Sequence, residues 1–175
     1  MEDDQILITQ FLRGDQRAFD RLVLRHQEKT RQFMYRATGD VDDANDLAQE
    51  VFIKVYHNLH RFRGGSEFST WLYRVGVNVL NSHFRRQRVR SWLPLGERED
   101  PEAPSADSNR DYRFRRLLAH LPRLSSQERQ VIILRGLQEL SVADTARILG
   151  TSENVVKVAY HTARKKLKEL LQDVR

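Results

Sequence analysis

Carboxylates and histidines at helical spacing are the residues of this chain best suited to chemistry. Asp43, Asp46 and Glu50 are separated by three and four residues, so one face of a helix would carry all three. Such carboxylates can bind a hard metal ion or exchange protons, and His57 and His60 are spaced as two zinc ligands can be. No third ligand, nucleophile motif or phosphate-binding loop accompanies them. We therefore expect no catalytic residue, no metal site and no cofactor, and favour a protein-contact or solvated face.

Aromatic residues alternate with arginines between residues 62 and 90. Within this segment Arg74, Asn78, Asn81 and Arg85 are separated by four, three and four residues, which places them on one helical face. Rings can stack on bases, amides can read base edges and guanidinium groups can hold phosphates, a combination suited to single-stranded or opened nucleic acid. Taken alone, the pattern is better explained by core aromatic residues and a helix end whose arginines face solvent.

The segment Ser141–Leu171 has the pattern of a helix-turn-helix. A short helix is followed by a tight turn at Gly150-Thr151-Ser152 and by a longer basic helix. Polar residues early in the second helix could meet base edges, and the cations beyond them could hold phosphates. An ordinary helical hairpin with a solvated face is the alternative. The candidate DNA-reading positions are Ser152, Glu153, Asn154, Val155, Lys157, Val158, His161, Thr162, Arg164 and Lys165.

The elements that carry these residues are all expected to be helices, because apolar residues recur at spacings of three and four and no stretch alternates as a strand does. Ser125 and Glu128 form a capping-box pattern, and Gly136 and Gly150 are expected to end helices. The helix over 43–59 should bury Ala44, Leu47, Ala48, Val51, Phe52, Val55, Tyr56 and Leu59. The expected helices span 5–13, 16–38, 43–59, 69–88, 112–120, 125–135, 141–149 and 152–172.

A stretch rich in proline and acidic residues divides the chain. Pro94, Pro101 and Pro104 fall within eleven residues, and residues 91–111 as a whole hold six acidic residues and two arginines. We interpret residues 91–111 as a flexible acidic linker between domains at 1–90 and 112–175. The predicted fold is therefore all-α, with two small helical domains and a helix-turn-helix in the second.

Composition narrows the class of protein further. The chain has 175 residues, a net charge of +6 and no cysteine, which excludes disulfides, thiolate catalysis and zinc fingers that use cysteine. A basic balance suits a nucleic-acid partner, although a solvated basic surface would give the same charge. No apolar stretch is long enough to span a membrane, and the acidic start lacks the pattern of a secretion signal. We expect a cytoplasmic protein without membrane insertion.

At this point two groups of motifs resemble the sigma-70 family of bacterial RNA polymerase sigma factors. Their order around a short linker resembles the extracytoplasmic-function (ECF) group. Those similar to region 2 are Leu22-Val23, Asp46–Phe52, Phe62-Arg63-Gly64 and Phe68–Arg74. Those similar to region 4 are Leu121-Pro122, Leu140-Ser141, Ile148–Gly150, Val156-Lys157 and Ala163-Arg164.

The resemblance implies roles for the matched residues. The acidic helix would bind core RNA polymerase through Asp43, Asp46, Gln49, Glu50 and Lys54. Capture of the minus-ten element during strand opening is implied for Phe62, Arg63, Gly64 and Asn78, and the aromatic–arginine segment adds Trp71, Arg74, Asn81 and Arg85. The ten candidate positions of the helix-turn-helix would read the minus-thirty-five element.

The resemblance also implies a function and its partners. The chain would bind core RNA polymerase and promoter DNA to start transcription, for a stress or envelope-response regulon, under an anti-sigma factor. It would not be an enzyme. Two alternatives remain at this point: a helix-turn-helix regulator that acts without polymerase, and an adaptor that docks on polymerase without reading DNA.

Overall fold

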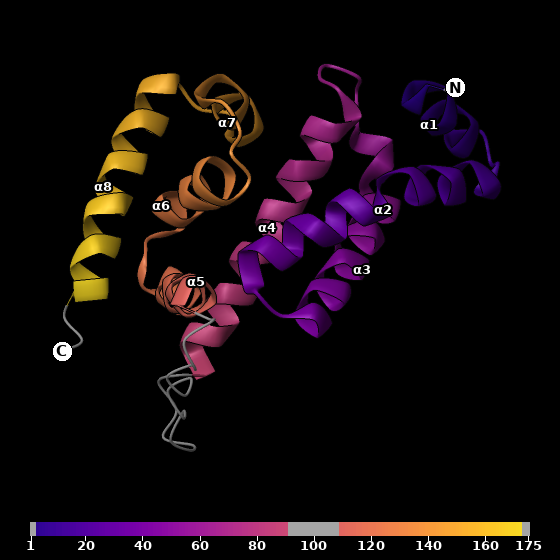
Figure 1. Ribbon diagram of the computed structural model, residues 1–175. Coiled ribbons are helices and arrows are strands. Elements are labelled where there is room, and N and C mark those ends of the chain that lie inside the picture. The colour runs from indigo at the N-terminus through magenta and orange to yellow at the C-terminus, as the bar shows by residue number, and fades with distance from the viewer. Residues whose placement is uncertain (1–2, 91–108, 173–175) are drawn as a thin grey trace.

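The computed structural model describes residues 3–90 and 109–172, and all regular structure in these ranges is helical. This confirms the all-α prediction. The N-terminal half contains four α-helices and a short 3-10 turn, and it lies on the right of Figure 1. Its elements are α1 (Asp4–Leu12), α2 (Gln16–Thr38), α3 (Val41–Asn58), η1 (Leu59–Arg61) and α4 (Phe68–Arg90).

The helices α2 and α3 both begin with a side-chain cap, and a glycine ends α2. The carboxylate of Asp15 accepts the backbone N–H of Arg17 at 3.0 Å at the start of α2, and Gly39 ends this helix with φ at 72°. The carboxylate of Asp40 then accepts the N–H of Asp43 at the start of α3. The helices α2, α3 and α4 pack around a core whose fully buried members include Leu22, Met34, Val51, Val55 and Leu80.

The expected buried stripe of α3 is only partly correct. Six of the eight residues expected to be buried are buried. Phe52 is half-buried, and Tyr56 is 41% exposed. The Tyr56 ring instead packs against Phe11 and Phe19 at ring-centroid distances of 5.2 and 5.1 Å, at the edge of the helical layer. An apolar spacing of three and four therefore includes residues at the margin of the buried face as well as those inside it.

The C-terminal half is a smaller helical unit. The capping box at its second helix is confirmed: the Ser125 hydroxyl accepts the N–H of Glu128, whose carboxylate accepts the N–H of Ser125. Its elements are α5 (Asn109–His120), η3 (Leu121–Arg123), α6 (Ser126–Val131), η4 (Ile132–Leu137), α7 (Val142–Leu149) and α8 (Glu153–Gln172).

The prediction that Gly136 ends the helix after Ser125 is wrong. The chain continues helically through Gly136 as η4, which is a π-helix. The N–H of Gln138 bonds to the carbonyl of Ile133, five residues earlier, at 3.0 Å. Glu139 follows with φ at 57°, so the reversal of the chain falls on a non-glycine residue three positions later.

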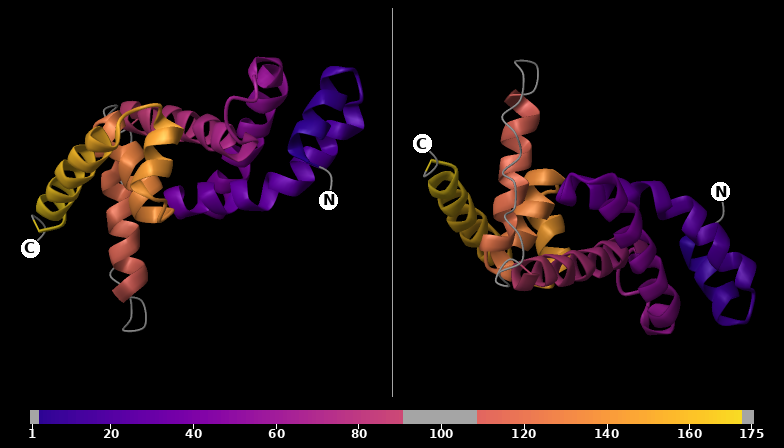
Figure 2. Two further views of the ribbon diagram at one scale, coloured as in Figure 1. Left: turned by 90° about the horizontal axis from the view of Figure 1, so that it is seen from above. Right: turned by 90° about the horizontal axis from the view of Figure 1, so that it is seen from below.

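The two halves pack against each other, with α7 and η3 beside α4 and η4 beside α2. Both views of Figure 2 show the C-terminal helices gathered at the left-hand ends of α4 and α2. Of the predicted linker, residues 91–108 lie outside the described residues, and 109–111 belong to α5, which starts three residues before the expected position. None of the helices in the described ranges is both long and apolar enough to cross a membrane.

Candidate nucleic-acid interface

On the acidic face of α3, some residues form ion pairs and others are exposed to solvent. The Glu50 carboxylate lies 3.3 Å from the ammonium of Lys54 and 3.3 Å from the guanidinium of Arg86 on α4. Asp43 lies 3.7 Å from the ring nitrogen of His83, also on α4. Asp46 and Gln49 are exposed on the outer surface. Of the residues predicted to bind polymerase, Asp43 and Glu50 thus connect α3 to α4, whereas Asp46 and Gln49 face solvent.

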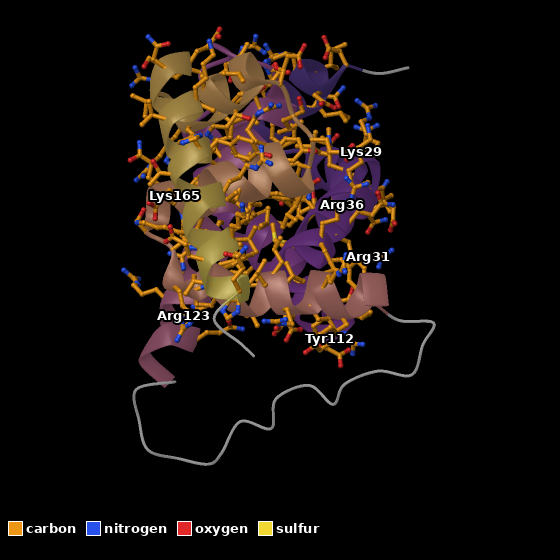
Figure 3. All side chains as sticks on the ribbon, turned by 60° about the vertical axis from the view of Figure 1, so that its left-hand side comes forward. Lys29, Arg31, Arg36, Tyr112, Arg123 and Lys165 are labelled. Carbon is orange, nitrogen blue, oxygen red and sulfur yellow. The ribbon has the colours of Figure 1, made fainter. Side chains whose placement is uncertain are left out.

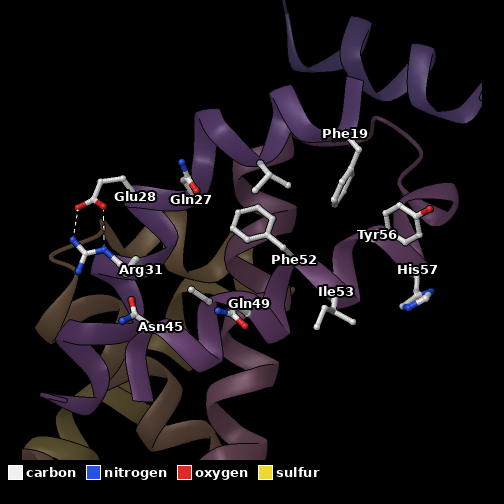
Figure 4. A pocket seen from close by; sticks show the side chains of 12 residues that line it. Phe19, Gln27, Glu28, Arg31, Asn45, Gln49, Phe52, Ile53, Tyr56 and His57 are labelled. Carbon is white, nitrogen blue, oxygen red and sulfur yellow. Dashed lines mark hydrogen bonds and ion pairs between the residues drawn. The ribbon is translucent and has the colours of Figure 1, made fainter. Parts of the chain in front are cut away.

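Beside Gln49, the sequence analysis missed an apolar groove of about 910 Å³ between α2 and α3. Figure 4 shows Phe19 from α2 and Phe52 from α3 lining it, with Gln49 and Ile53 along one side. Ile53 is 58% exposed. At one end Glu28 forms two hydrogen bonds with Arg31, which lower the pKa of that carboxyl group. The available sequence signal was Ile53, an apolar residue outside the expected buried stripe.

The aromatic residues before and at the start of α4 form a cluster. Phe62 is buried, and its ring lies 5.8 Å from the ring of Phe68 and 5.5 Å from that of Trp71. Trp71 is half-buried, whereas Arg63 and Gly64 are exposed in the loop. In this structure Phe62 is therefore a core residue, and Trp71 is the ring of this cluster that reaches the surface.

The predicted polar face of α4 is present, but its members differ in environment. Arg74, Asn78 and Arg85 are exposed, and Asn81 is half-buried. The Oδ1 atom of Asn81 is buried without a hydrogen-bond partner among the described residues. The guanidinium of Arg74 donates hydrogen bonds to two backbone carbonyls of α7. No local pattern in the sequence predicts this contact.

The helix-turn-helix has the expected turn. Gly150 ends α7 with φ at 65°, and its N–H bonds to the carbonyl of Ala146. The Ser152 hydroxyl accepts the N–H of Val155 at 3.3 Å, so Ser152 caps α8. Val156, Ala163 and Leu167 form the buried face of α8, and Tyr160 is half-buried.

The other side of α8 is open along its length. Nearly all the candidate DNA-reading residues are exposed, Val158 to 66%; Thr162 is half-buried. Lys157 lies 3.7 Å from Glu153 one turn earlier, and the guanidinium of Arg164 lies 5.6 Å from the centre of the Tyr160 ring. Figure 3 shows Lys165 on α8 at the edge of the molecule. This side combines short polar residues, apolar methyl groups and cations, as a helix in a DNA groove requires.

The histidine pair offers no site for a metal in the parts of the chain that are described. His57 and His60 are both exposed, and no group of three or more potential ligands surrounds them or occurs elsewhere in those parts. The surfaces described are an acidic and apolar face on α2 and α3, a polar face on α4, and the exposed side of the basic helix α8.

Comparison with known proteins divides the chain in the same way. Residues 22–90 match the Sigma-70 region 2 family, and residues 114–167 match the family of Sigma-70, region 4. The chain is 33% identical to RNA polymerase sigma-H factor of Pseudomonas aeruginosa, over 98% of this chain and 95% of that protein. It is 30% identical to ECF RNA polymerase sigma factor SigW of Bacillus subtilis, over 95% and 96% of the two chains.

Two solved structures are similar over nearly the whole chain. One is CnrH in complex with the cytosolic domain of CnrY, with a TM-score of 0.63, 28% identity and coverage of 99% and 100% of the two chains. The other is sigma factor RpoE from Bartonella quintana in complex with the anti-sigma factor NepR, with a TM-score of 0.59, 26% identity and coverage of 90% and 98%.

Proposed function

Because the chain belongs to the sigma-70 family, within the extracytoplasmic-function group, we propose that it binds core RNA polymerase and directs it to promoters. As a sigma factor it acts in transcription initiation through promoter recognition. The observation that carries the proposal is the presence of both matched regions in one chain, each on its own helical unit. A regulator that binds duplex DNA alone would need only the second.

The proposed polymerase-binding surface comprises Asp43, Asp46, Gln49, Glu50 and Lys54 on α3 together with the neighbouring apolar groove. The carboxylates and the amide give this surface electrostatic specificity, and the groove offers apolar area to bury. Asp46 and Gln49 are its most accessible polar members. Asp43 and Glu50 contribute while they also hold α4.

The proposed minus-ten surface lies on the loop before α4 and on α4 itself. Arg63 and Gly64, exposed in the loop, would meet unstacked bases together with Trp71, against whose ring the buried Phe62 packs. The polar face of α4 supplies the remaining contacts. Its proposed members are Arg74, Asn78, Asn81 and Arg85.

The proposed minus-thirty-five reader is the exposed side of α8. Asn154 can pair with adenine, Glu153 can accept from cytosine, and Val155 and Val158 can contact thymine methyl groups. Lys157, Arg164 and Lys165 are placed to hold phosphates. Ser152 caps the helix in this structure, so its main contribution is to fix where α8 begins.

Regulation and location follow from the family. The two structural neighbours are complexes, one of them with the anti-sigma factor NepR, and we expect an anti-sigma partner for this chain. A stress or envelope-response regulon and a cytoplasmic location, where the polymerase works, are part of the same proposal. The chain would act by binding and positioning, without an enzymatic activity of its own.

The proposal is tested by transcription in vitro from a promoter library with core polymerase, with and without the chain. We expect promoter-selective transcripts only when both are present. Sequence-selective binding to duplex DNA that polymerase does not change would support the regulator instead. Binding to polymerase without any promoter-selective transcription would support the adaptor.

A further inference from the structure

The loop proposed to receive the minus-ten element has a neighbour on α1, which lies outside the segment that matches region 2. Gln5 is exposed in the first turn of α1. A Cβ atom built on Gly64 would stand 3.5 Å from the Nε2 atom of Gln5 and 3.8 Å from its Oε1 atom. Figure 1 shows α1 and the loop before α4 at the same end of the N-terminal half. The side-chain amide of Gln5 therefore lies beside the backbone of this loop.

Gly64 leaves the space in front of this amide open. Its φ of 72° is left-handed, a conformation that other residues adopt only at a cost. Because it has no side chain, its backbone is uncovered beside Gln5, where any other residue would place a Cβ atom against the amide. The neighbouring Arg63 is exposed as well. A planar base that enters the loop can thus meet a glycine backbone, a guanidinium group and a primary amide.

Asp4, the residue before Gln5, holds the first turn of α1 in place. Its carboxylate accepts a hydrogen bond from Arg25 at 2.7 Å and lies 2.9 Å from the Nε2 atom of His26, both on α2. All three side chains are partly buried. The ring of His26 also packs against Phe68, the first residue of α4, with 5.1 Å between ring centroids. Contacts with both α2 and α4 therefore fix the end of α1 that carries Gln5.

The amide of Gln5 takes no part in holding α1. The helix is capped by Asp3, whose carboxylate accepts the backbone N–H of Gln5 at 3.3 Å, and it is packed through the buried Leu7 and Ile8. No hydrogen bond joins the Gln5 side chain to any residue that the structure describes. This amide is therefore available to a ligand, and it offers donors and an acceptor side by side.

Adenine is the base whose edge suits such an amide best. A glutamine can donate to N7 of adenine and accept from its N6 amino group in one bidentate pair. Bases that have left the stack are read by hydrogen bonds to their exposed edges. The minus-ten surface proposed above is the part of the chain that would meet such bases.

We propose that Gln5 is a further specificity-determining residue of the minus-ten site and reads the edge of an unstacked adenine held over Gly64. The proposal rests on the function above, because only a chain that takes part in promoter opening meets such a base. It extends the DNA-binding surface from α4 and its preceding loop to α1, where the sequence analysis found no candidate residue.

Transcription by core polymerase and the chain from a library with a randomised minus-ten element tests the proposal. Gln5→Ala should lower the preference for adenine at one position roughly tenfold and leave the other positions unchanged. Gln5→Glu should move the preference at that position toward cytosine, because a carboxylate accepts from N4 and cannot donate to N7. A carboxylate is favourable in the first turn of a helix, so this variant should keep the fold.

Gln127→Ala is the matched control. Gln127 is an exposed glutamine at the second position of α6, as Gln5 is at the second position of α1, but it belongs to the C-terminal half. Its replacement should leave the base preference at every minus-ten position unchanged. Thermal unfolding of each variant checks that the fold is retained. An unchanged minus-ten profile in Gln5→Ala, or an equal loss at all positions, would overturn the proposal.

The role of Gln5 and the proposed function fail in different ways. Promoter-selective transcription with base preferences that do not depend on Gln5 would remove only the role of this residue. Absence of promoter-selective transcription with the unsubstituted chain would remove the proposed function, and the role of Gln5 with it.

Discussion

Glu50 on α3 and Arg86 on α4 form an ion pair with 3.3 Å between carboxylate and guanidinium. The pair places one end of the proposed polymerase-binding surface in direct contact with the helix proposed to bind the minus-ten element. Glu50 therefore has a structural role that the exposed Asp46, one turn earlier, does not share.

Asp46→Arg should weaken binding to core polymerase while the free energy of unfolding stays within about 0.5 kcal/mol of its original value. Glu50→Arg should weaken binding too, but should also cost about 1 kcal/mol, because it places a cation beside Arg86 and Lys54. Pull-down with core enzyme and urea unfolding measure the two effects. Glu169→Arg, an exposed reversal on α8, should change neither. Unchanged polymerase affinity in Asp46→Arg would remove α3 from the proposed surface.

Asn78→Ala should impair strand opening more than initial duplex binding. Its amide can donate and accept, which suits the edge of an unstacked base, and its exposure means that truncation leaves no cavity. Permanganate footprints report the melted bases, and gel shifts on closed complexes report the first step. Asn58→Ala, at the end of α3, serves as the amide control. Equal losses at both steps would contradict the assignment.

Asn154→Ala should change base preference at one or two positions of the minus-thirty-five element, each by roughly 1–3 kcal/mol. Lys165→Ala should weaken all promoters about equally and flatten the dependence of binding on salt, because it removes a phosphate contact. Selection from a randomised element with each variant separates the two effects. A shift in sequence preference from Lys165→Ala alone would mean that α8 lies differently in the groove.

The sequence was sufficient to locate helix ends at several places where the end signals are local, although α3 begins at Val41, two residues before the expected position. Asp15 and Gly39 bound α2 at the predicted residues, and the Ser125–Glu128 capping box starts α6 as expected. The prediction at Gly136 was wrong because a single glycine destabilises a helix only slightly, and η4 continues through this residue.

The candidate site was less predictable because its environment depends on residues distant in sequence. The spacing around Arg74 predicted a polar helical face. The two carbonyls that accept hydrogen bonds from Arg74 lie more than seventy residues away in the sequence. Phe62 followed a motif associated with base capture, yet the fold buries it against Phe68 and Trp71. The groove beside Gln49 arises only when α2 and α3 are brought together.

Glu128 should make the C-terminal half sensitive to acid. Burial raises the pKa of its carboxyl group, but the ion pair with Lys166 at 2.6 Å and the hydrogen bonds with Ser125 outweigh burial, so the pKa lies below its usual value. The folded form therefore favours the carboxylate. Its stabilisation is complete above the unfolded pKa of 4.5 and is lost as pH falls through the folded value.

Glu128→Gln should cost about 1–3 kcal/mol at neutral pH and should reduce the loss of stability on acidification. Urea unfolding at neutral pH and near pH 4, followed by circular dichroism, measures both effects. Glu169→Gln on the exposed side of α8 is the control. Parallel pH profiles for Glu128→Gln and the unsubstituted chain would show that this carboxyl group does not set the acid response.

Glu139→Gly should stabilise the chain by about 0.5–1 kcal/mol. A non-glycine residue at φ of 57° is strained, and relief of that strain exceeds the extra flexibility that glycine gives the unfolded chain. Glu139→Ala keeps the strain and should bring no gain. Thermal unfolding of the three proteins decides the matter, and equal melting temperatures would mean that the turn accommodates Glu139 without cost.

The π-helical turn of η4 sets the rotational phase of the residues within it and directly after it. Its wide hydrogen bond from Gln138 to Ile133 takes up more residues than an α-helical turn would use. Removing one residue between Ile132 and Leu137 would let the turn tighten, and the next side chains would swing by about 100° around the helix axis. Arg135 would then lose its position over Tyr160. The contact of Arg135 with α8, the helix proposed to read DNA, thus depends on a count of backbone units, which no side-chain substitution can restore.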